Sequence, residues 1–299
     1  MSRKNVEFNA CELSDALLFT DKNLSYHDML NIITECIKNE TFPDKIVLNN
    51  LNDLQGYKED FMKKEEIIDI RIKNFRDTIQ NTLTEDINCI FLTGKKNTIE
   101  KIETLNKNLD KKHAKADLYI EYNFGNIIGW SCKQTTNATK SNYSVHKMLP
   151  KDVSKKLNLT KKEVLDSNGF PKFVKSDRPR INELFYPGVP NKYFEELKNE
   201  IQNNNTLIKT KLVNSLYGTS LPYTLYEFDG TKITEIKLEN YDIITFEENK
   251  DYYYTNSGEL RKAAKLFYKL SIGTKIYRVE VRWKGCIHTA SPQFMIHES

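Results

Sequence analysis

Apolar residues recur at helical spacing in the first part of the chain, and this spacing changes to strand-like runs after about residue 86. The interval 1–85 is therefore expected to be mainly helical. Its clearest helix is predicted over 58–83, where one apolar stripe contains Phe61, Ile68, Ile72, Phe75, Ile79 and Leu83. Such a stripe indicates a helix that packs one side against the core.

Short β-rich runs follow. The run 87–93 is apolar and ends at Gly94, which predicts a buried strand, and 98–109 has the spacing of a short amphipathic helix. Two further runs, 116–122 and 127–133, are separated only by a short turn containing Gly125. They predict a β-hairpin.

The second half of the chain alternates between loop-like, helical and strand-like patterns. The interval 134–190 is polar and basic with several Pro and Gly, which predicts loops and short helices, whereas 191–215 is helical in pattern. Later strand-like runs occupy 223–228, 232–238, 252–254 and 275–284. With no internal repeat, the pattern predicts one continuous architecture of mixed α/β class.

Composition excludes several classes of protein. The chain has 299 residues and is 39% hydrophobic, enough for a packed core, and no run approaches the roughly 18 apolar residues of a membrane helix. No membrane partner is expected, and the N-terminus lacks the apolar segment of a secretory signal, so we expect a cytoplasmic protein. Five scattered Cys and five scattered His argue against a disulfide framework or a zinc site. Any bound metal should be held by carboxylates.

Charge is unevenly distributed. The formal net charge is +4, but 140–180 contains eleven basic and four acidic residues, so that segment carries +7 and the remainder −3. A positive stretch of this kind favours a polyanionic partner, although an ordinary Lys-rich surface would look the same.

The predicted hairpin can have one of two loop lengths, and only one of them brings an acid and a lysine together on the same face. A two-residue turn puts Asp117 opposite Cys132, whereas a three-residue loop, 123–125, puts it opposite Ser131 and diagonal to Lys133 on the same face. Three-residue loops typically end in a left-handed glycine, and Gly125 stands at that position. A plain cross-strand ion pair is the alternative interpretation.

The strand with Asp117, the short turn, and the second strand ending Ser131-Cys132-Lys133 before Gln134 resemble the PD-(D/E)XK nuclease motif, particularly that of type II restriction endonucleases. The resemblance covers 87–148. It implies a central mixed sheet flanked by helices in a single domain, 1–299. Within this domain, 1–85 would be the mainly helical region, 86–150 the catalytic core, and 151–299 the DNA-recognition and dimerisation elements.

The resemblance also implies a Mg²⁺-dependent hydrolysis of phosphodiester bonds. Asp117 and the Cys132 carbonyl would hold the ion, Lys133 would act on the attacking water, and Gln134 would orient water or phosphate. Two positions depart from the family pattern, since Ala116 replaces a proline and Ser131 replaces an acid. A helix acid would then complete the metal site. The candidate is Glu65, which falls on the apolar stripe and competes with Glu66, Asp69 and Glu85.

DNA contacts are expected from two segments. Asn137, Lys140 and Asn142 follow the catalytic strand, and Arg282 and Lys284 lie on a C-terminal strand with one charged face. The resulting hypothesis is a type II restriction endonuclease of a restriction-modification system, which cuts double-stranded DNA at a short palindrome as a homodimer. Two alternatives stay open: a catalytically decayed DNA-binding protein on the same scaffold, and an unrelated mixed α/β protein.

Overall fold

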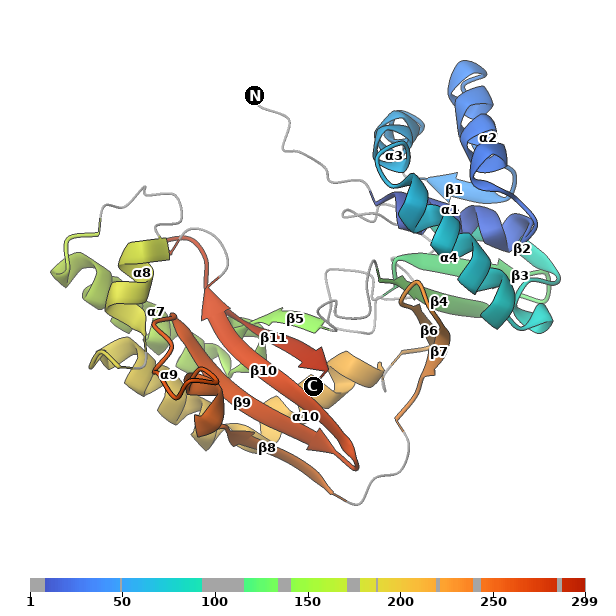
Figure 1. Cartoon of the computed structure of the whole chain (residues 1–299). Helices are drawn as coiled ribbons and strands as arrows, with labels where there is room; N and C mark the ends of the chain where they lie inside the picture. Colours follow the sequence, from blue (N-terminus) through green and yellow to red (C-terminus); the bar gives the residue numbers. More distant parts are fainter. Residues whose placement is uncertain are drawn as a thin grey trace. The chain divides into compact units, whose positions relative to one another are not determined.

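The computed structural model describes residues 9–48, 50–92, 116–133, 141–170, 178–186, 188–218, 221–238, 243–283 and 287–298. Its contacts divide the chain into two compact units, where we expected one continuous architecture. Unit 1 comprises Met1–Ala138 and Gly218–Lys237, and unit 2 comprises Thr139–Tyr217 and Leu238–Ser299. Both units contain helices and strands, which confirms the mixed α/β class (Figure 1). In the described part of the chain, no helix is long and apolar enough to cross a membrane.

Unit 1 contains a six-stranded mixed sheet in the order β1-β2-β3-β4-β6-β7. Its elements are α1 (Ala10–Thr20), α2 (Tyr26–Lys38), β1 (Ile46–Leu48), α3 (Asp53–Phe61), α4 (Glu65–Thr78), the 3₁₀ turn η1 (Asn81–Leu83), β2 (Ile87–Leu92), β3 (Leu118–Tyr122), β4 (Ile127–Cys132), β6 (Thr224–Phe228) and β7 (Ile233–Ile236). The pairs β1–β2 and β4–β6 are parallel, and the other neighbours are antiparallel. The hairpin β3–β4 is therefore central.

The helices of unit 1 form the main core with one face of this sheet (Figure 1). Strand alternation explains the packing, because Leu118, Ile120 and Trp130 join the helix-side core whereas Tyr119 lies in a separate cluster with Tyr223. Each of these apolar side chains is less than one tenth exposed. The hairpin is thus buried on both faces, and its ends are the places where polar chemistry is accessible.

The single helix predicted over 58–83 is wrong. Two helices, α3 and α4, occur instead, with a break between Phe61 and Glu65. Asp60, near the end of α3, accepts hydrogen bonds from the Ala10 N–H at 2.8 Å and from Lys64 Nζ at 2.7 Å. The apolar spacing continues across the break, since Phe61 and Ile68 are both fully buried. Periodicity alone could not reveal the change of direction.

Unit 2 contains a five-stranded antiparallel sheet in the order β5-β11-β10-β9-β8. Its elements are β5 (Ser141–Ser144), α6 (Val145–Met148), α7 (Lys151–Ser167), α8 (Arg178–Phe185), α9 (Lys192–Asn203), α10 (Asn205–Tyr217), β8 (Ile244–Glu248), η3 (Lys250–Tyr253), β9 (Lys265–Ile272), β10 (Lys275–Trp283) and β11 (Pro292–Glu298). Trp283 packs against Phe185, Tyr193 and Phe194, which come from α8 and the start of α9.

Most later predictions of secondary structure are confirmed. The helical interval 191–215 forms α9 and α10, and 223–228, 232–238 and 275–284 contain β6, β7 and β10. Two predictions are wrong: 252–254 falls largely in the 3₁₀ turn η3, and the expected loops of 134–190 include the 17-residue helix α7. This helix buries Leu157 and Val164 together with Lys161. The predicted helix 98–109 lies outside the described residues.

Candidate active site

The β3–β4 loop has the three-residue form that the glycine predicts. The Tyr122 N–H donates to the Asn126 carbonyl at 2.9 Å, and the Gly125 N–H donates to the Tyr122 carbonyl at 2.8 Å. Gly125 adopts φ +83°, in the left-handed region. Leu118 consequently pairs with Trp130, which is the register of the odd loop.

Asp117 immediately precedes β3, and its carboxylate is bound by the end of β4. Its N–H donates to the Trp130 carbonyl at 2.9 Å. Its Oδ2 accepts a 2.8 Å hydrogen bond from the Cys132 N–H and lies 3.5 Å from the Ser131 hydroxyl. The positive charge of Lys133 also acts on this carboxylate and favours its ionised form. The structure thus brings together the acid and the lysine that the motif requires.

A second acid lies near Asp117, and it comes from α1. Asn9 caps this helix by accepting from the Cys11 N–H at 3.2 Å, and its Nδ2 donates to Oε1 of Glu12 at 3.0 Å. Burial and then the negative charge of Asp117 raise the pKa of Glu12 to about 8, so the two carboxylates influence each other. The cap signature Asn9-x-x-Glu12 marks a helix start in the sequence. Nothing in that signature indicates that Glu12 lies near Asp117, which is more than one hundred residues further along the chain.

Burial also raises the pKa of Asp117, although Lys133 and the hydrogen bonds from Cys132 and Ser131 oppose the shift. Two half-buried carboxylates with raised pKa values share one end of the hairpin. Ionising both of them in the same place is unfavourable unless a cation compensates the charge. The pair is suited to a hard divalent ion such as Mg²⁺, which binds one or two carboxylates and retains waters.

Among the described residues, no group of three or more His, Cys, Asp or Glu side chains is arranged to hold a metal ion. A divalent ion at this site would have Glu12, Asp117 and the carbonyl of Cys132 as its candidate protein ligands, and water and substrate phosphate would supply the rest.

Behind the carboxylates lies a buried ion pair. The Arg71 guanidinium contacts both carboxylate oxygens of Asp15, at 2.6 and 2.7 Å, and both side chains are at most 1% exposed. The Trp130 indole N–H donates to Asp15 at 2.7 Å. Arg71 also donates to the carbonyls of Lys133, at 2.7 Å, and Phe228, at 3.2 Å. These bonds connect α1 and α4 to the end of β4.

The remaining residues from the sequence prediction are dispersed. Ser131 and Cys132 are buried beside Asp117, whereas Asn142 lies on β5 and Arg282 on β10 of unit 2. Gln134, Asn137, Lys140 and Lys284 lie outside the described residues.

The expectation that Glu65 is buried on the apolar stripe is wrong. It is exposed at the first position of α4, and its charge acts on Tyr26. Ile68, three residues further along the helix, is fully buried, whereas Glu65 stands at the helix start and its side chain reaches solvent. Glu12 is the acid that the structure places near Asp117.

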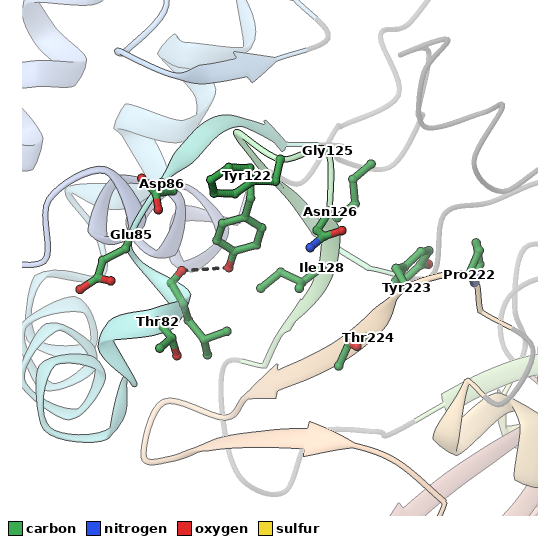
Figure 2. Close-up of a pocket in the computed structure, with 13 residues that line it drawn as sticks. Thr82, Glu85, Asp86, Tyr122, Gly125, Asn126, Ile128, Pro222, Tyr223 and Thr224 are labelled. Atoms are coloured by element: carbon green, nitrogen blue, oxygen red, sulfur yellow. Dashed lines mark hydrogen bonds between the residues drawn. The ribbon is translucent and has the colours of Figure 1, made fainter.

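A pocket of about 790 Å³ lies at the turn end of the hairpin, and neither Glu12 nor Asp117 lines it. Figure 2 shows Glu85 and Asp86 on one side of it and Pro222 and Tyr223 on the other. The Tyr122 hydroxyl donates to the Leu83 carbonyl at 3.0 Å beneath it. Glu85, one of the competing candidates for the helix acid, lines this pocket, whereas Asp117, Lys133 and Glu65 do not.

Comparisons of the chain with protein-family models, with curated proteins and with solved structures find no match.

Proposed function

We propose that this protein is a Mg²⁺-dependent endonuclease of the type II restriction class that hydrolyses phosphodiester bonds in double-stranded DNA. One observation carries the proposal: the Asp117 carboxylate is bound by the end of β4, where the positive charge of Lys133 acts on it, and it acts in turn on the Glu12 carboxyl. An acid pair beside an amine is the set of groups that metal-assisted phosphate hydrolysis requires.

The fold of unit 1 supports this proposal. The resemblance implies a central mixed sheet flanked by helices, and in unit 1 the hairpin that precedes Lys133 lies in the middle of a mixed sheet with helices packed on one face. Ser131 departs from the motif because it lacks a carboxylate, and Glu12 supplies the missing negative charge from another element.

In the proposed mechanism each residue has a separate task. Glu12, Asp117 and the Cys132 carbonyl would hold Mg²⁺, which stabilises charge on the phosphate and lowers the pKa of water when bound. The Lys133 ammonium would hold a water or phosphate oxygen and offset negative charge that develops in the transition state. The Cys132 N–H orients the Asp117 carboxylate through its 2.8 Å bond. The dimer that we expect would present two such sites to the two strands of a palindrome.

Cleavage of a long DNA of mixed sequence, with Mg²⁺ or with EDTA, tests the proposal. We expect discrete fragments with Mg²⁺ alone. Lys133→Ala, Asp117→Asn and Glu12→Gln should each lower the cleavage rate by about 100-fold or more, as removal of a catalytic group commonly does. Glu65→Gln is the matched control, since it neutralises an exposed acid of unit 1 and should leave the rate unchanged.

Two outcomes would overturn the enzymatic proposal. Cleavage that persists in Lys133→Ala would come from another site or another protein. DNA binding without any cleavage, by a purified and folded protein, would instead favour the decayed DNA-binding alternative.

A further inference from the structure

One face of the unit 2 sheet carries a cluster of basic and other polar side chains, together with Phe267 and Met295, which are at most 5% exposed. Cross-strand pairing places the side chains of directly opposed residues on the same face. By the register of β5, β11, β10, β9 and β8, this face contains Asn142, Ser144, Gln293, Met295, His297, Arg278, Glu280, Arg282, Lys265, Phe267, Lys269 and Glu247. We call it the basic sheet face.

The opposite face of the same sheet is occupied by helices. The Tyr277 and Tyr217 hydroxyls lie 2.8 Å apart, which joins β10 to α10. Trp283 contacts the aromatic rings of α8 and α9. Residues 277, 279, 281 and 283 of β10 point to this helix side, so Arg278, Glu280 and Arg282 point away from it.

A single carboxylate lies among three cations on the basic sheet face. Glu280, whose side chain is 6% exposed, contacts Lys265 Nζ at 2.9 Å, Arg278 Nε at 3.5 Å and Arg282 Nη1 at 3.7 Å. The side chains of these three cations are 27%, 44% and 36% exposed, in that order. One buried anion therefore orients three partly exposed cations and leaves an excess of positive charge.

Within the part of the chain that the structure describes, both arginines have N–H donors that make no hydrogen bond. Arg278 contacts Glu280 through Nε, and Arg282 uses Nη1 for Glu280 and Nε for the Met295 sulfur. Both Nη atoms of Arg278 and the Nη2 of Arg282 have no hydrogen-bond partner among the described residues. A guanidinium group carries five N–H donors in a planar array that matches two phosphate oxygens.

The charge of the whole unit agrees with this arrangement. Unit 2 contains 24 Lys and Arg against 16 Asp and Glu, a formal +8, whereas unit 1 contains 21 against 25, a formal −4. Positive charge is therefore concentrated in the unit that does not contain the acid pair. Neutralisation of phosphates by such residues supplies most of the affinity of proteins for nucleic acids.

We propose that the basic sheet face of unit 2 is the docking surface for the phosphate backbone of double-stranded DNA. Arg278, Arg282 and Lys265 bind phosphates, and Glu280 holds them in position. The choice of DNA among polyanions rests on the proposed function, but binding to the face does not depend on cleavage by unit 1.

Fluorescence anisotropy with a labelled 30-base-pair DNA duplex in EDTA tests this inference on the full chain. The Arg278→Gln/Arg282→Gln variant should bind about 10- to 100-fold more weakly, and the slope of log K against log salt should decrease by about 2. The matched control is Lys151→Gln/Lys155→Gln, which removes the same charge from exposed positions of α7 in unit 2. It should change affinity by less than about threefold. Arg278→Lys/Arg282→Lys keeps the charge and should recover most of the affinity.

The outcomes separate this inference from the proposed function. Loss of binding in the arginine variant together with normal binding by Lys73→Gln, which removes a positive charge from an exposed position of α4 in unit 1, supports the face even if no cleavage is ever observed. Equal weakening in the arginine and α7 variants would show that net charge alone is responsible, and would overturn the inference. Binding to phosphatidylserine vesicles without binding to the duplex would also overturn the inference. Circular dichroism of each variant establishes that it is folded.

Discussion

The guanidinium group of Arg71 donates a 2.7 Å hydrogen bond to the backbone carbonyl of Lys133. This bond joins a fully buried ion pair to the residue that would act on the substrate, because Arg71 also contacts both oxygens of Asp15. The position of Lys133 thus depends on packing between α1, α4 and β4. A buried pair of this kind tolerates no loss of one partner, since the other charge would remain without compensation.

Arg71→Ala should lower the free energy of unfolding by about 3–5 kcal/mol, because it leaves the Asp15 carboxylate buried and unpaired. Urea denaturation measures the change. Lys73→Ala, at an exposed position of the same helix, should cost less than about 0.5 kcal/mol. A loss below about 1 kcal/mol for Arg71→Ala would show that the pair is not held as described.

The stability of the protein should fall as the pH rises through the range in which Glu12 loses its proton. Its pKa is raised from 4.5 to about 8 in the folded state, so between these values the folded protein retains a proton that the unfolded chain releases. Glu12→Gln removes the titrating carboxyl group, and with it the loss of stability at high pH. Its Tm should exceed that of the unmodified protein by about 2–5 °C at pH 9, and the two should agree within about 1 °C at pH 5.

Glu66→Gln, at an exposed position of α4, is the control for that experiment and should show no such pH dependence. A Tm difference for Glu12→Gln that is the same at both pH values would mean that Glu12 titrates normally. Mg²⁺ at millimolar concentration should reduce the difference at pH 9, because an ion that binds the folded state stabilises the ionised pair.

In the proposed nuclease site, Ser131→Ala should lower the cleavage rate by less than about threefold, because its hydroxyl makes only a 3.5 Å contact with Asp117 and Glu12 would supply the second acid. Single-turnover rates at saturating Mg²⁺ measure the effect. A decrease as large as that of Lys133→Ala would instead assign Ser131 a direct part in the chemistry.

Gly125→Ala should destabilise unit 1 by about 1–2 kcal/mol, the cost of the left-handed conformation for a residue with a Cβ. An added Cβ at this position meets no atom within 4 Å, so the effect would come from the backbone alone. Phe124→Ala is the neighbouring control. Its ring is 83% exposed and its loss should be nearly neutral in urea denaturation.

The local geometry of the hairpin could be predicted from the sequence because it depends on neighbouring residues. Gly125 permits the left-handed turn, the turn sets the register, and the register places Asp117 near Ser131 and Lys133. Each step is a matter of backbone sterics and of the two-residue period of a strand. The sequence by itself therefore determined the mixed α/β class and one half of the candidate site.

Only the tertiary structure decided the other half. Glu12 lies near Asp117, and Arg71 binds Asp15, because α1 and α4 pack on one face of the sheet in a particular position. Helix periodicity identifies which residues of a helix face the core, but not how far along the sheet the helix lies. Glu65 illustrates the difference: its spacing was that of a buried residue, yet it stands at the first position of α4 and is exposed. Contacts between distant segments are set by the packing of whole elements, which local patterns do not encode.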